Sequence, residues 1–279
     1  MKDLILEIEP EKTLFLDYPV SLEPRYDMKN CHRGISDILN VNYLLYHQLL
    51  KEFLSHREKL WEIASNKNER IEENDPIWIN GFIPGLDTIC LYGMVAKYNP
   101  NIYLEVGSGN STKVVNKAIK DNNLRTKIWS IDPEPRTEIN SLCHSIIRQP
   151  LEEVGLEIFK NLEKGDILFV DNSHRVFMNS DVTTFFLDIL PALEKGVIIQ
   201  IHDVLLPYDY PKEWASRFYS EQYMLAMLLL FASKKIEVLM PNYFISQNPE
   251  LASIINPLWE NSKLDKVERH GGSFWFQIK

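Results

Sequence analysis

The chain has 279 residues, of which 45% are hydrophobic, and this is enough apolar material for a packed core in one large domain or a domain with an extension. Its 39 acidic and 30 basic residues give a net charge of -9, which disfavours a general nucleic-acid-binding surface. Three widely spaced cysteines, Cys31, Cys90 and Cys143, indicate neither a disulfide framework nor a zinc site. No window approaches the roughly 18 apolar residues of a membrane span, so we expect a cytoplasmic protein with no nucleic-acid partner and no membrane span.

The first 80 residues predict an N-terminal extension that precedes a main domain of residues 81–279. Prolines and mixed polar residues in 1–40 indicate an extended lead-in. From residue 40 to about 64, leucines and aromatic residues recur at three-to-four spacing, which predicts an amphipathic helix. Its apolar stripe suits either core packing or the contact face of a homo-oligomer.

A regular alternation of strand-like and helical segments follows a charged, solvated connection at 65–76 and a helix at 87–98. Five such units predict an α/β fold with a parallel sheet covered by helices on both faces, and two further strands follow near the carboxyl terminus. The predicted strands are 102–106, 127–131, 145–148, 167–170, 197–201, 235–240 and 272–278. The predicted helices are 111–120, 135–143, 152–162, 181–193 and 220–231.

A glycine turn follows the first of these strands, in the stretch Glu105-Val-Gly107-Ser-Gly109-Asn-Ser111. The two glycines allow a sharp turn with close backbone approach, and Ser111 or Thr112 can cap the helix that follows. Such a turn directs N–H groups of the helix N-terminus at a ligand above the strand end. A GxG pattern alone is weak evidence for nucleotide binding, so the other strand ends must support it.

Polar residues also follow the second, fourth and fifth predicted strands directly. They are Asp132-Pro-Glu134, Asp171-Asn-Ser-His174 and His202-Asp203. Ligands of open parallel sheets bind beyond the carboxyl ends of the strands. We therefore expect these residues and the glycine turn to line one ligand site.

Asp132 stands where a carboxylate can accept hydrogen bonds from the two ribose hydroxyls of an adenosine ligand. A dinucleotide-binding turn would have a third glycine at position 112, where this chain has Thr112. A pyrophosphate ligand is therefore disfavoured relative to a ligand without phosphates. Glu105 would also repel a phosphate and is better suited to a ligand that carries an ammonium group.

These motifs together resemble the class I S-adenosylmethionine-dependent methyltransferases. The glycine turn is similar to their first motif, and Asp132 is similar to the acidic residue that holds the ribose. Three further segments resemble a branch related to the macrocin O-methyltransferase and cephalosporin hydroxylase group. They are Gly165 to His174, Leu190 to Asp203 and Pro207 to Trp214. The resemblance covers about residue 80 to the carboxyl terminus. It implies a Rossmann-like, mostly parallel sheet of seven strands, with the last strand antiparallel.

The resemblance implies an enzyme that transfers the methyl group of S-adenosylmethionine to a hydroxyl of a small molecule or glycan. Cofactor contacts are expected from the first motif and two strand-end aspartates, namely Glu105, Gly107, Ser108, Gly109, Asn110, Ser111, Asp132 and Asp171. The catalytic candidates are His202 and His174 as bases, because an ordinary histidine pKa of about 6.5 suits this role. Asp203 is expected to orient one of the imidazoles.

Metal binding is disfavoured by one departure from the family pattern. Metal-dependent members of the wider group place one carboxylate after the fourth strand and an acidic pair after the fifth. Asp171 and Asp203 match this pattern, but His202 replaces the first acid of the pair, and Mg²⁺ prefers oxygen ligands. We expect no metal; if one binds, Asp171 and Asp203 are its expected ligands.

Two other functions stay open at this point. One is an S-adenosylmethionine-binding protein without turnover, and the other is an NAD-dependent oxidoreductase, which Thr112 disfavours. The aromatic residues from Tyr208 to Tyr223, between the fifth strand and the following helix, predict a lid over the acceptor. A packed surface loop is the alternative for this segment.

Overall fold

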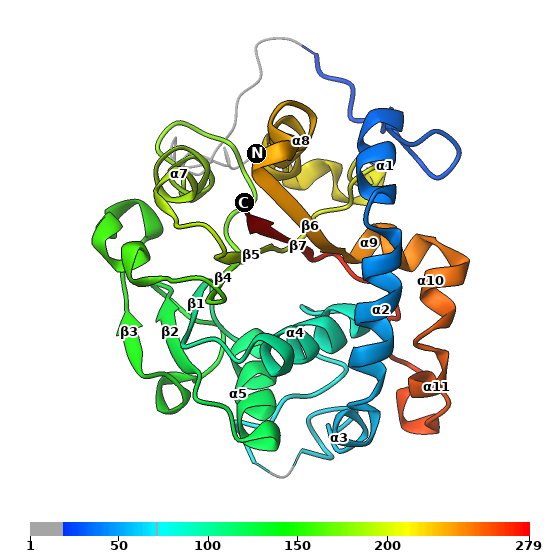
Figure 1. Ribbon diagram of the computed structural model, residues 1–279, viewed down its shortest axis with the longest axis vertical. Helices are drawn as coiled ribbons and strands as arrows, with labels where there is room; N and C mark the ends of the chain where they lie inside the picture. The colour runs from blue at the N-terminus through cyan, green and yellow to red at the C-terminus, as the bar shows by residue number, and fades with distance from the viewer. Residues whose placement is uncertain (1–18, 71) are drawn as a thin grey trace, which may run out of the picture.

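The computed structural model describes residues 19–70 and 72–279, which contain a seven-stranded sheet (Figure 1). The strands are β1 (Ile102–Val106), β2 (Lys127–Ile131), β3 (Ser145–Ile147), β4 (Ile167–Val170), β5 (Ile198–Ile201), β6 (Ile236–Pro241) and β7 (Phe274–Ile278). Their order is β3-β2-β1-β4-β5-β7-β6. β7 is antiparallel to both of its neighbours, and the other neighbouring pairs are parallel. This arrangement confirms the predicted Rossmann-like α/β fold, with the last strand antiparallel.

The central strands are buried because helices cover both faces of the sheet. Every residue of β4 and β5 is buried, as their nearly continuous apolar sequences predict. The chain changes its direction of travel across the sheet between β1 and β4, which are neighbours. In open α/β sheets, ligands bind in the crevice beyond the strand ends at such a point.

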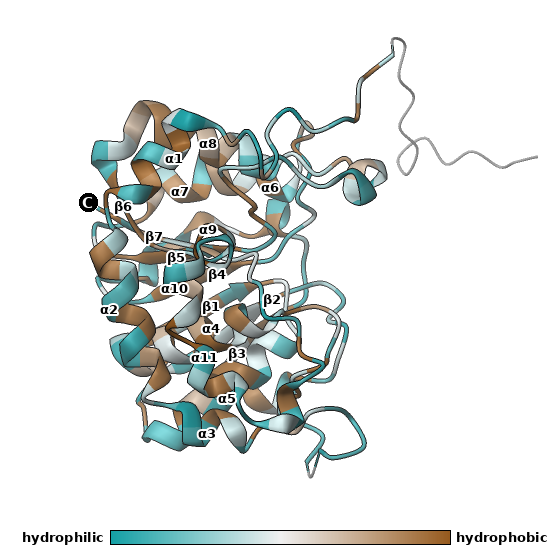
Figure 2. Cartoon of the chain, turned by 90° about the vertical axis from the view of Figure 1, so that its right-hand side faces the viewer, coloured by the Kyte–Doolittle hydropathy of each residue, from teal (hydrophilic) through white to brown (hydrophobic). Residues whose placement is uncertain are grey.

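Helices lie on both sides of the sheet in Figures 1 and 2. On one side, α4 (Gly85–Tyr98) packs against α5 (Asn110–Asn122) and against α2 (Tyr43–Leu54). On the other side, α8 (Glu221–Ala232) contacts α1 (Arg33–Asn40). α5 begins at the glycine turn after β1, so its N-terminus points at the strand ends.

The N-terminal helices differ from the single helix predicted for residues 40–64. The chain instead forms α1, α2 and the short α3 (Arg57–Trp61), and α1 lies within the predicted lead-in. Between α1 and α2, Asn42 Nδ2 donates a hydrogen bond to the carbonyl oxygen of Val238 in β6, at 2.8 Å. Such a contact with a distant strand has no signature in local periodicity. Residues 1–18 of the lead-in lie outside the described residues.

Two of the predicted helices close to the strand ends are wrong. Residues 135–143 form only a 3-10 turn at Asn140–Leu142, and residues 152–162 form two such turns, at Leu151–Glu153 and Leu156–Asn161. The first segment has few apolar residues to bury, and a glycine interrupts the second. Neither segment therefore gains enough from packing to form a full helix.

The helix predicted for residues 181–193 is divided into three parts. These are α6 (Asp181–Thr184), a π-helical stretch at Phe185–Ile189 and α7 (Leu190–Ala192). Pro191 has no N–H to donate to the preceding turn, which favours a local departure from α-helical hydrogen bonding.

Three helices between β6 and β7 have no counterpart in the sequence prediction. They are α9 (Asn242–Gln247), α10 (Pro249–Ser253) and α11 (Asn256–Trp259). Trp61 Nε1 of the N-terminal extension donates a hydrogen bond to the carbonyl oxygen of Leu258, at 2.9 Å. The extension and the sheet domain thus bury one common core. In the part of the chain that the structure describes, no helix has the length and apolar character needed to cross a bilayer.

The glycine turn after β1 lies directly against the end of β4. The backbone N–H of Asp171 donates to the carbonyl oxygen of Val106 at 2.8 Å. A Cβ at Gly107 would lie 2.0 Å from the backbone oxygen of Asp171, and Gly107 has a φ of +79°. Both the space and the backbone conformation therefore require glycine.

We predict that Gly107→Ala destabilises the protein by more than Gly165→Ala. Both glycines have positive φ, but a Cβ at Gly165, where φ is +91°, meets nothing within 4 Å. Gly165→Ala should therefore report the backbone strain alone, on the order of 1–2 kcal/mol. Gly107→Ala adds a backbone clash, and its free energy of unfolding, measured with urea, should fall by roughly 1–3 kcal/mol more. Equal losses in the two variants would contradict a close approach of the turn to β4.

Candidate functional site

Glu105 lies beneath the glycine turn and braces it. Its side chain is fully buried, and its two oxygens accept hydrogen bonds from Thr112 Oγ1 and from Ser111 Oγ, the latter at 3.1 Å. Burial raises the pKa of Glu105 to about 7, although these hydrogen bonds favour the carboxylate. Glu105 is absent from the linings of the three cavities described below. Its effect on a ligand would therefore pass through the turn.

Thr112 completes the same brace from the first turn of α5. Its Oγ1 accepts a hydrogen bond from the backbone N–H of Gly109 at 3.1 Å and donates one to Glu105. The N-cap residue of α5 is Gly109, and not Ser111 or Thr112 as expected. Thr112 instead supports the helix start by accepting the hydrogen bond from the N–H of Gly109. A glycine at position 112 would lose both contacts.

Asp132 organises the loop after β2. Its Oδ2 accepts a hydrogen bond from the backbone N–H of Ser108 at 2.7 Å, and its Oδ1 accepts one from that of Glu134 at 2.8 Å. Arg148 Nη1 donates to the carbonyl oxygen of Asp132 at 3.2 Å and to Ser130 Oγ at 3.1 Å. A carboxylate has about four acceptor positions, so each oxygen keeps capacity for a ligand hydroxyl.

His174 stands at the end of β4 between three carboxylates. Its Nδ1 lies 2.9 Å from Glu221 Oε2, and its Nε2 lies 3.2 Å from Asp171 Oδ1 and 3.5 Å from Asp203 Oδ2. Glu221, in the first turn of α8, is completely buried, and Asn172 Nδ2 donates to its other oxygen at 2.9 Å. Glu221 thus supports the imidazole from behind, and the two aspartates lie on the side of the cavity.

His202 occupies an equivalent position at the end of β5. Its Nε2 lies 3.4 Å from Asp87 Oδ2, and its Nδ1 lies 3.4 Å from Asp203 Oδ1. Asp87, in the first turn of α4, is buried and accepts hydrogen bonds from Asn242 Nδ2 at 2.8 Å and from the backbone N–H of Gly272 at 2.7 Å. The two histidines therefore have equivalent surroundings, with a buried carboxylate behind each imidazole.

The surrounding charges hold both imidazoles in the cationic form. Burial alone would lower the pKa of His202, but the charges of Asp203, Asp87 and Asp171 outweigh it and raise the pKa to about 9. Burial is likewise outweighed at His174, whose pKa is raised well above its ordinary value by its carboxylate partners. Burial alone would raise the pKa of Asp171, but the hydrogen bond to His174 and the charge of His202 lower this pKa to about 2. A cationic imidazole cannot accept a proton, which weakens the expectation that these histidines act as bases.

The backbone at this site is unusual at two residues that are not glycine. His174 has a φ of 59° and Asp203 has a φ of 52°, both in the left-handed region. Residues in such conformations cluster at functional sites, where the surrounding structure holds them in place. Both residues follow their strands within a few positions, so the strained backbone turns their side chains toward the same corner.

The donors around Asp171 and Asp203 do not form the arrangement of a metal site. Within residues 19–70 and 72–279, no group of three or more His, Cys, Asp or Glu side chains is placed to hold a metal ion. The two carboxylates face imidazole nitrogens instead. This network of ion pairs differs from the all-oxygen set that Mg²⁺ prefers.

Three cavities share lining residues above the carboxyl ends of the strands. The Asp132 cavity, of about 340 Å³, is lined by Gly107, Ser108 and Asp132, among others. The glycine-turn cavity, of about 200 Å³, is lined by Ser108, Gly109, Asn110 and Ser111, among others. The aromatic cavity, of about 640 Å³, is lined by His174, His202, Asp203, Trp214, Arg217 and Tyr219, among others. The structure thus brings every predicted site residue except Glu105 to one of the three.

Asp171 and Arg136 line all three cavities, so they mark the place where the cavities meet. Arg136 comes from the loop after β2, and its guanidinium lies 5.0 Å from the ring centre of Phe82. Phe82 belongs to the segment before α4, which lines both the glycine-turn and aromatic cavities. The N-terminal extension and its junction with the main domain therefore form part of the site.

The segments that form the walls are also held in place by side chains. Asp209, in the aromatic segment after β5, accepts hydrogen bonds from the backbone N–H groups of Arg25 and Tyr26 at 2.7 and 3.1 Å. Lys67 and Arg70 of the charged connection line the glycine-turn cavity. That connection, expected to be merely solvated, thus contributes cations to the site.

Asp87, Glu221 and Arg136 are the site residues that the sequence prediction misses. Glu221 is 47 positions from the histidine it supports. Asp87 precedes the first predicted strand in the sequence, and His202 follows the fifth. No local spacing connects such partners. Arg136 could have been found from the sequence, because it follows the end of β2 by a few residues and the loops after parallel strands line ligand sites.

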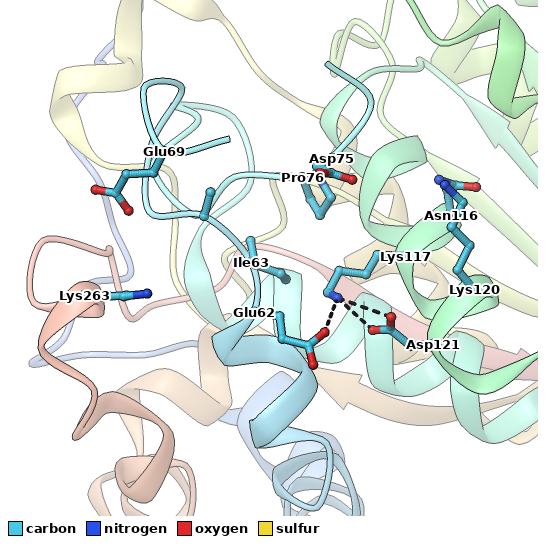
Figure 3. Close-up of a pocket in the computed structure, with 11 residues that line it drawn as sticks. Glu62, Ile63, Glu69, Asp75, Pro76, Asn116, Lys117, Lys120, Asp121 and Lys263 are labelled. Carbon is cyan, nitrogen blue, oxygen red and sulfur yellow. Dashed lines mark hydrogen bonds and ion pairs between the residues drawn. The ribbon is translucent and has the colours of Figure 1, made fainter. Parts of the chain in front are cut away.

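A separate cavity of about 670 Å³ lies along the C-terminal half of α5 (Figure 3). Its central amine, Lys117 Nζ, is paired with Glu62 at 3.2 Å and with Asp121 at 3.0 Å. It shares no lining residue with the three cavities at the strand ends. Because its central charges already pair with one another, this cavity is not part of the candidate site.

Residues 104–204 match a family model described as a methyltransferase domain. This match confirms the methyltransferase resemblance over the segment from β1 to the end of β5, and it does not extend to the narrower branch. No curated protein matches the chain.

The solved structures that this chain resembles distantly include two methyltransferases. The SAH-bound Podospora anserina methyltransferase PaMTH1 is 17% identical, with 69% of this chain and 77% of that chain covered and a TM-score of 0.41. The plantazolicin methyltransferase BpumL in complex with SAH is 12% identical, with 88% of this chain and 99% of that chain covered and a TM-score of 0.43.

We predict that Glu105 makes stability depend on pH between about 4.5 and 7. Its folded-state pKa of about 7 exceeds its ordinary value of 4.5, so its contribution is fully present below pH 4.5 and is lost as the pH rises through 7. Glu105→Gln cannot ionise. The free energy of unfolding of the wild type, minus that of the variant, should fall by up to about 3 kcal/mol over this range. A difference that stays constant with pH would contradict the raised pKa.

We predict that each buried carboxylate controls its own histidine. The stability contributed by protonated His202 is fully present below pH 6.5 and is lost as the pH rises through about 9. Asp87→Asn should lower the pKa of His202, and Glu221→Gln should lower that of His174, as measured by NMR titration of the imidazoles. Each variant serves as the control for the other histidine. Wild-type imidazoles that titrate near 6.5 would contradict the charge network.

Proposed function

We propose that this chain transfers the methyl group of S-adenosylmethionine to a hydroxyl of a small molecule or sugar. The proposal rests chiefly on one observation: three cavities meet at Asp171, with the glycine turn on one side and the paired histidines on the other. The methyltransferase-domain match over residues 104–204 supports the reaction class. In this proposal the cofactor occupies the first two cavities and the acceptor enters the third.

The cofactor is assigned by the chemistry of the linings. The Asp132 carboxylate, in the Asp132 cavity, accepts the ribose hydroxyls, as its position beyond β2 suggests. The methionine end occupies the glycine-turn cavity, where the N-terminus of α5 and Arg136 provide positive charge for the carboxylate. Asp171, beside this cavity, supplies negative charge near the cationic sulfonium.

The methyl group on the sulfonium is already activated, so alignment is the enzyme's main contribution. Holding acceptor and cofactor in line can be worth about 7–11 kcal/mol. The walls of the aromatic cavity and the meeting point at Asp171 would provide this alignment. When the new O–CH₃ bond forms and the CH₃–S bond breaks, the hydroxyl proton must leave the acceptor.

Asp203 is the group best placed to accept this proton. Both imidazoles are held cationic by their carboxylate partners, as the raised pKa values of His174 and His202 indicate. They would therefore orient Asp203, which both face, and the carboxylate would accept the proton. This reverses the roles expected from the sequence, where the histidines act as bases and Asp203 orients. A positioned base of this kind contributes roughly 100- to 10,000-fold.

Binding without turnover and hydride transfer with NAD predict different results. The first predicts binding of S-adenosylmethionine but no transfer of a labelled methyl group to any member of an acceptor panel. The second predicts binding of NAD, which Thr112 opposes because it fills the position of the third glycine and bonds to Glu105.

We predict that the wild-type protein binds SAH, the demethylated product, and that Asp132→Ala weakens this binding at least tenfold in calorimetry. Each charge-assisted hydrogen bond that the carboxylate makes to a ribose hydroxyl is worth about 1.5–3 kcal/mol. Asp188→Ala is the matched control, because Asp188 is exposed on the π-helical stretch and absent from the three cavities. Absence of SAH binding by the wild type, or unchanged affinity in Asp132→Ala, would refute the proposal.

A further inference from the structure

The aromatic cavity is charged differently at its two ends. His174 and His202 are buried, and they hold the carboxylates of Asp171 and Asp203 at the inner end. Arg217 lines the same cavity from an exposed position in the segment after β5. The cavity thus runs from an inner cluster, in which two carboxylates pair with two imidazoles, to an outer guanidinium.

The guanidinium of Arg217 stacks on two rings that also line the cavity. It lies 4.3 Å from the ring centre of Trp214 and 5.5 Å from that of Tyr219. The ring of Tyr219 lies 4.7 Å from the imidazole of His174. One aromatic ring therefore separates the outer cation from the histidine at the inner end.

The position of Arg217 is held by its neighbours. Arg175 Nε donates a hydrogen bond to the carbonyl oxygen of Arg217 at 2.8 Å, and the Arg175 guanidinium lies 5.3 Å from the ring centre of Tyr219. Trp214 stacks on Tyr210, with ring centres 6.1 Å apart and an interplanar angle of 25°. The rings and the backbone at the outer end thus form a packed unit.

The hydrogen-bond donors of Arg217 have no partner among the described residues. No carboxylate of residues 19–70 and 72–279 lies within 4.0 Å of its guanidinium, and the side chain donates no hydrogen bond within that part of the chain. A guanidinium presents five donors in a planar fork that matches the oxygens of a carboxylate or phosphate. Stacking on Trp214 and Tyr219 orients this fork without using its donors.

We propose that the acceptor carries a carboxylate or phosphate next to a ring, that Arg217 binds this oxyanion, and that Trp214 and Tyr219 cover the ring. The inference rests on the proposed function and specifies its acceptor. At the inner end Asp171 and Asp203 already pair with the two imidazoles, whereas the donors of Arg217 are unpaired among the described residues, so the oxyanion of the acceptor is placed at the outer end and its hydroxyl at the inner end. Arg136 is not assigned to the acceptor, because it also lines both proposed cofactor cavities.

The test compares anionic compounds with neutral counterparts of the same shape, in calorimetric titrations of SAH-loaded protein. One pair is 3,4-dihydroxybenzoate and 3,4-dihydroxybenzamide, and the other is glucose 6-phosphate and glucose. In at least one pair the anionic member should bind at least tenfold more tightly. The pair that responds distinguishes an aromatic carboxylate from a sugar phosphate.

Arg217→Met should remove this preference while SAH affinity is retained, and Arg217→Lys, which keeps the charge but loses the fork, should retain part of it. Arg57→Met is the matched control, because Arg57 also stacks on a tryptophan, 5.6 Å from the ring centre of Trp61, and is absent from the aromatic cavity. Its anion preference should equal that of the wild type.

Equal binding of the neutral members, binding of none of the four compounds, or an unchanged preference in Arg217→Met would overturn the inference. Binding of SAH is measured in the same preparation. If SAH binds and no preference for anions is found, only the acceptor assignment fails. If SAH does not bind, the proposed function fails first.

Discussion

The contact between Gly107 and the backbone of Asp171 is the constraint on which the candidate site depends. The Asp171 oxygen occupies the place where a side chain at position 107 would begin, at 2.0 Å from a Cβ. This approach brings the N-terminus of α5 beside the end of β4. Because β1 and β4 are neighbours at the point where the sheet order reverses, the turn and Asp171 line the same cavities.

Charge alternation makes the buried polar cluster possible. Asp87 and Glu221 lie behind the two imidazoles, and Asp171 and Asp203 lie in front of them. An isolated buried charge is costly, but here each imidazole has carboxylates on both sides and each carboxylate has donors. The arrangement keeps Asp171 ionised at the meeting point of the three cavities, as its pKa of about 2 indicates. It also fixes the side chains that would have to be aligned with a reacting methyl group.

The two ends of the site have different origins in the chain. The Asp132 cavity is bounded mainly by strand ends and by the loops that follow them directly, and the glycine-turn cavity takes further lining residues from 67–83. The aromatic cavity is enclosed by segments far apart in the sequence, at 78–85, 214–219 and 266–270. Loops of this kind vary more readily than the strands that carry them. Residues 214–219 and 266–270 line neither of the other two cavities, so under the proposed function they are the segments that can change acceptor choice without altering the cofactor end.

The sequence alone was sufficient to locate the strands, because runs of strand length are separated by polar turns, and β1 and β2 begin and end where predicted. It also located Asp132, Asp171, His174 and His202-Asp203, since residues that follow parallel strands share one edge. It could not supply the partners of the histidines, because Asp87 and Glu221 reach them only through the packing of α4 and α8. The protonation states, and with them the proposed exchange of roles between the histidines and Asp203, depend on distances between residues remote in sequence. Local pattern determines where a strand ends; only tertiary packing decides which charges meet there.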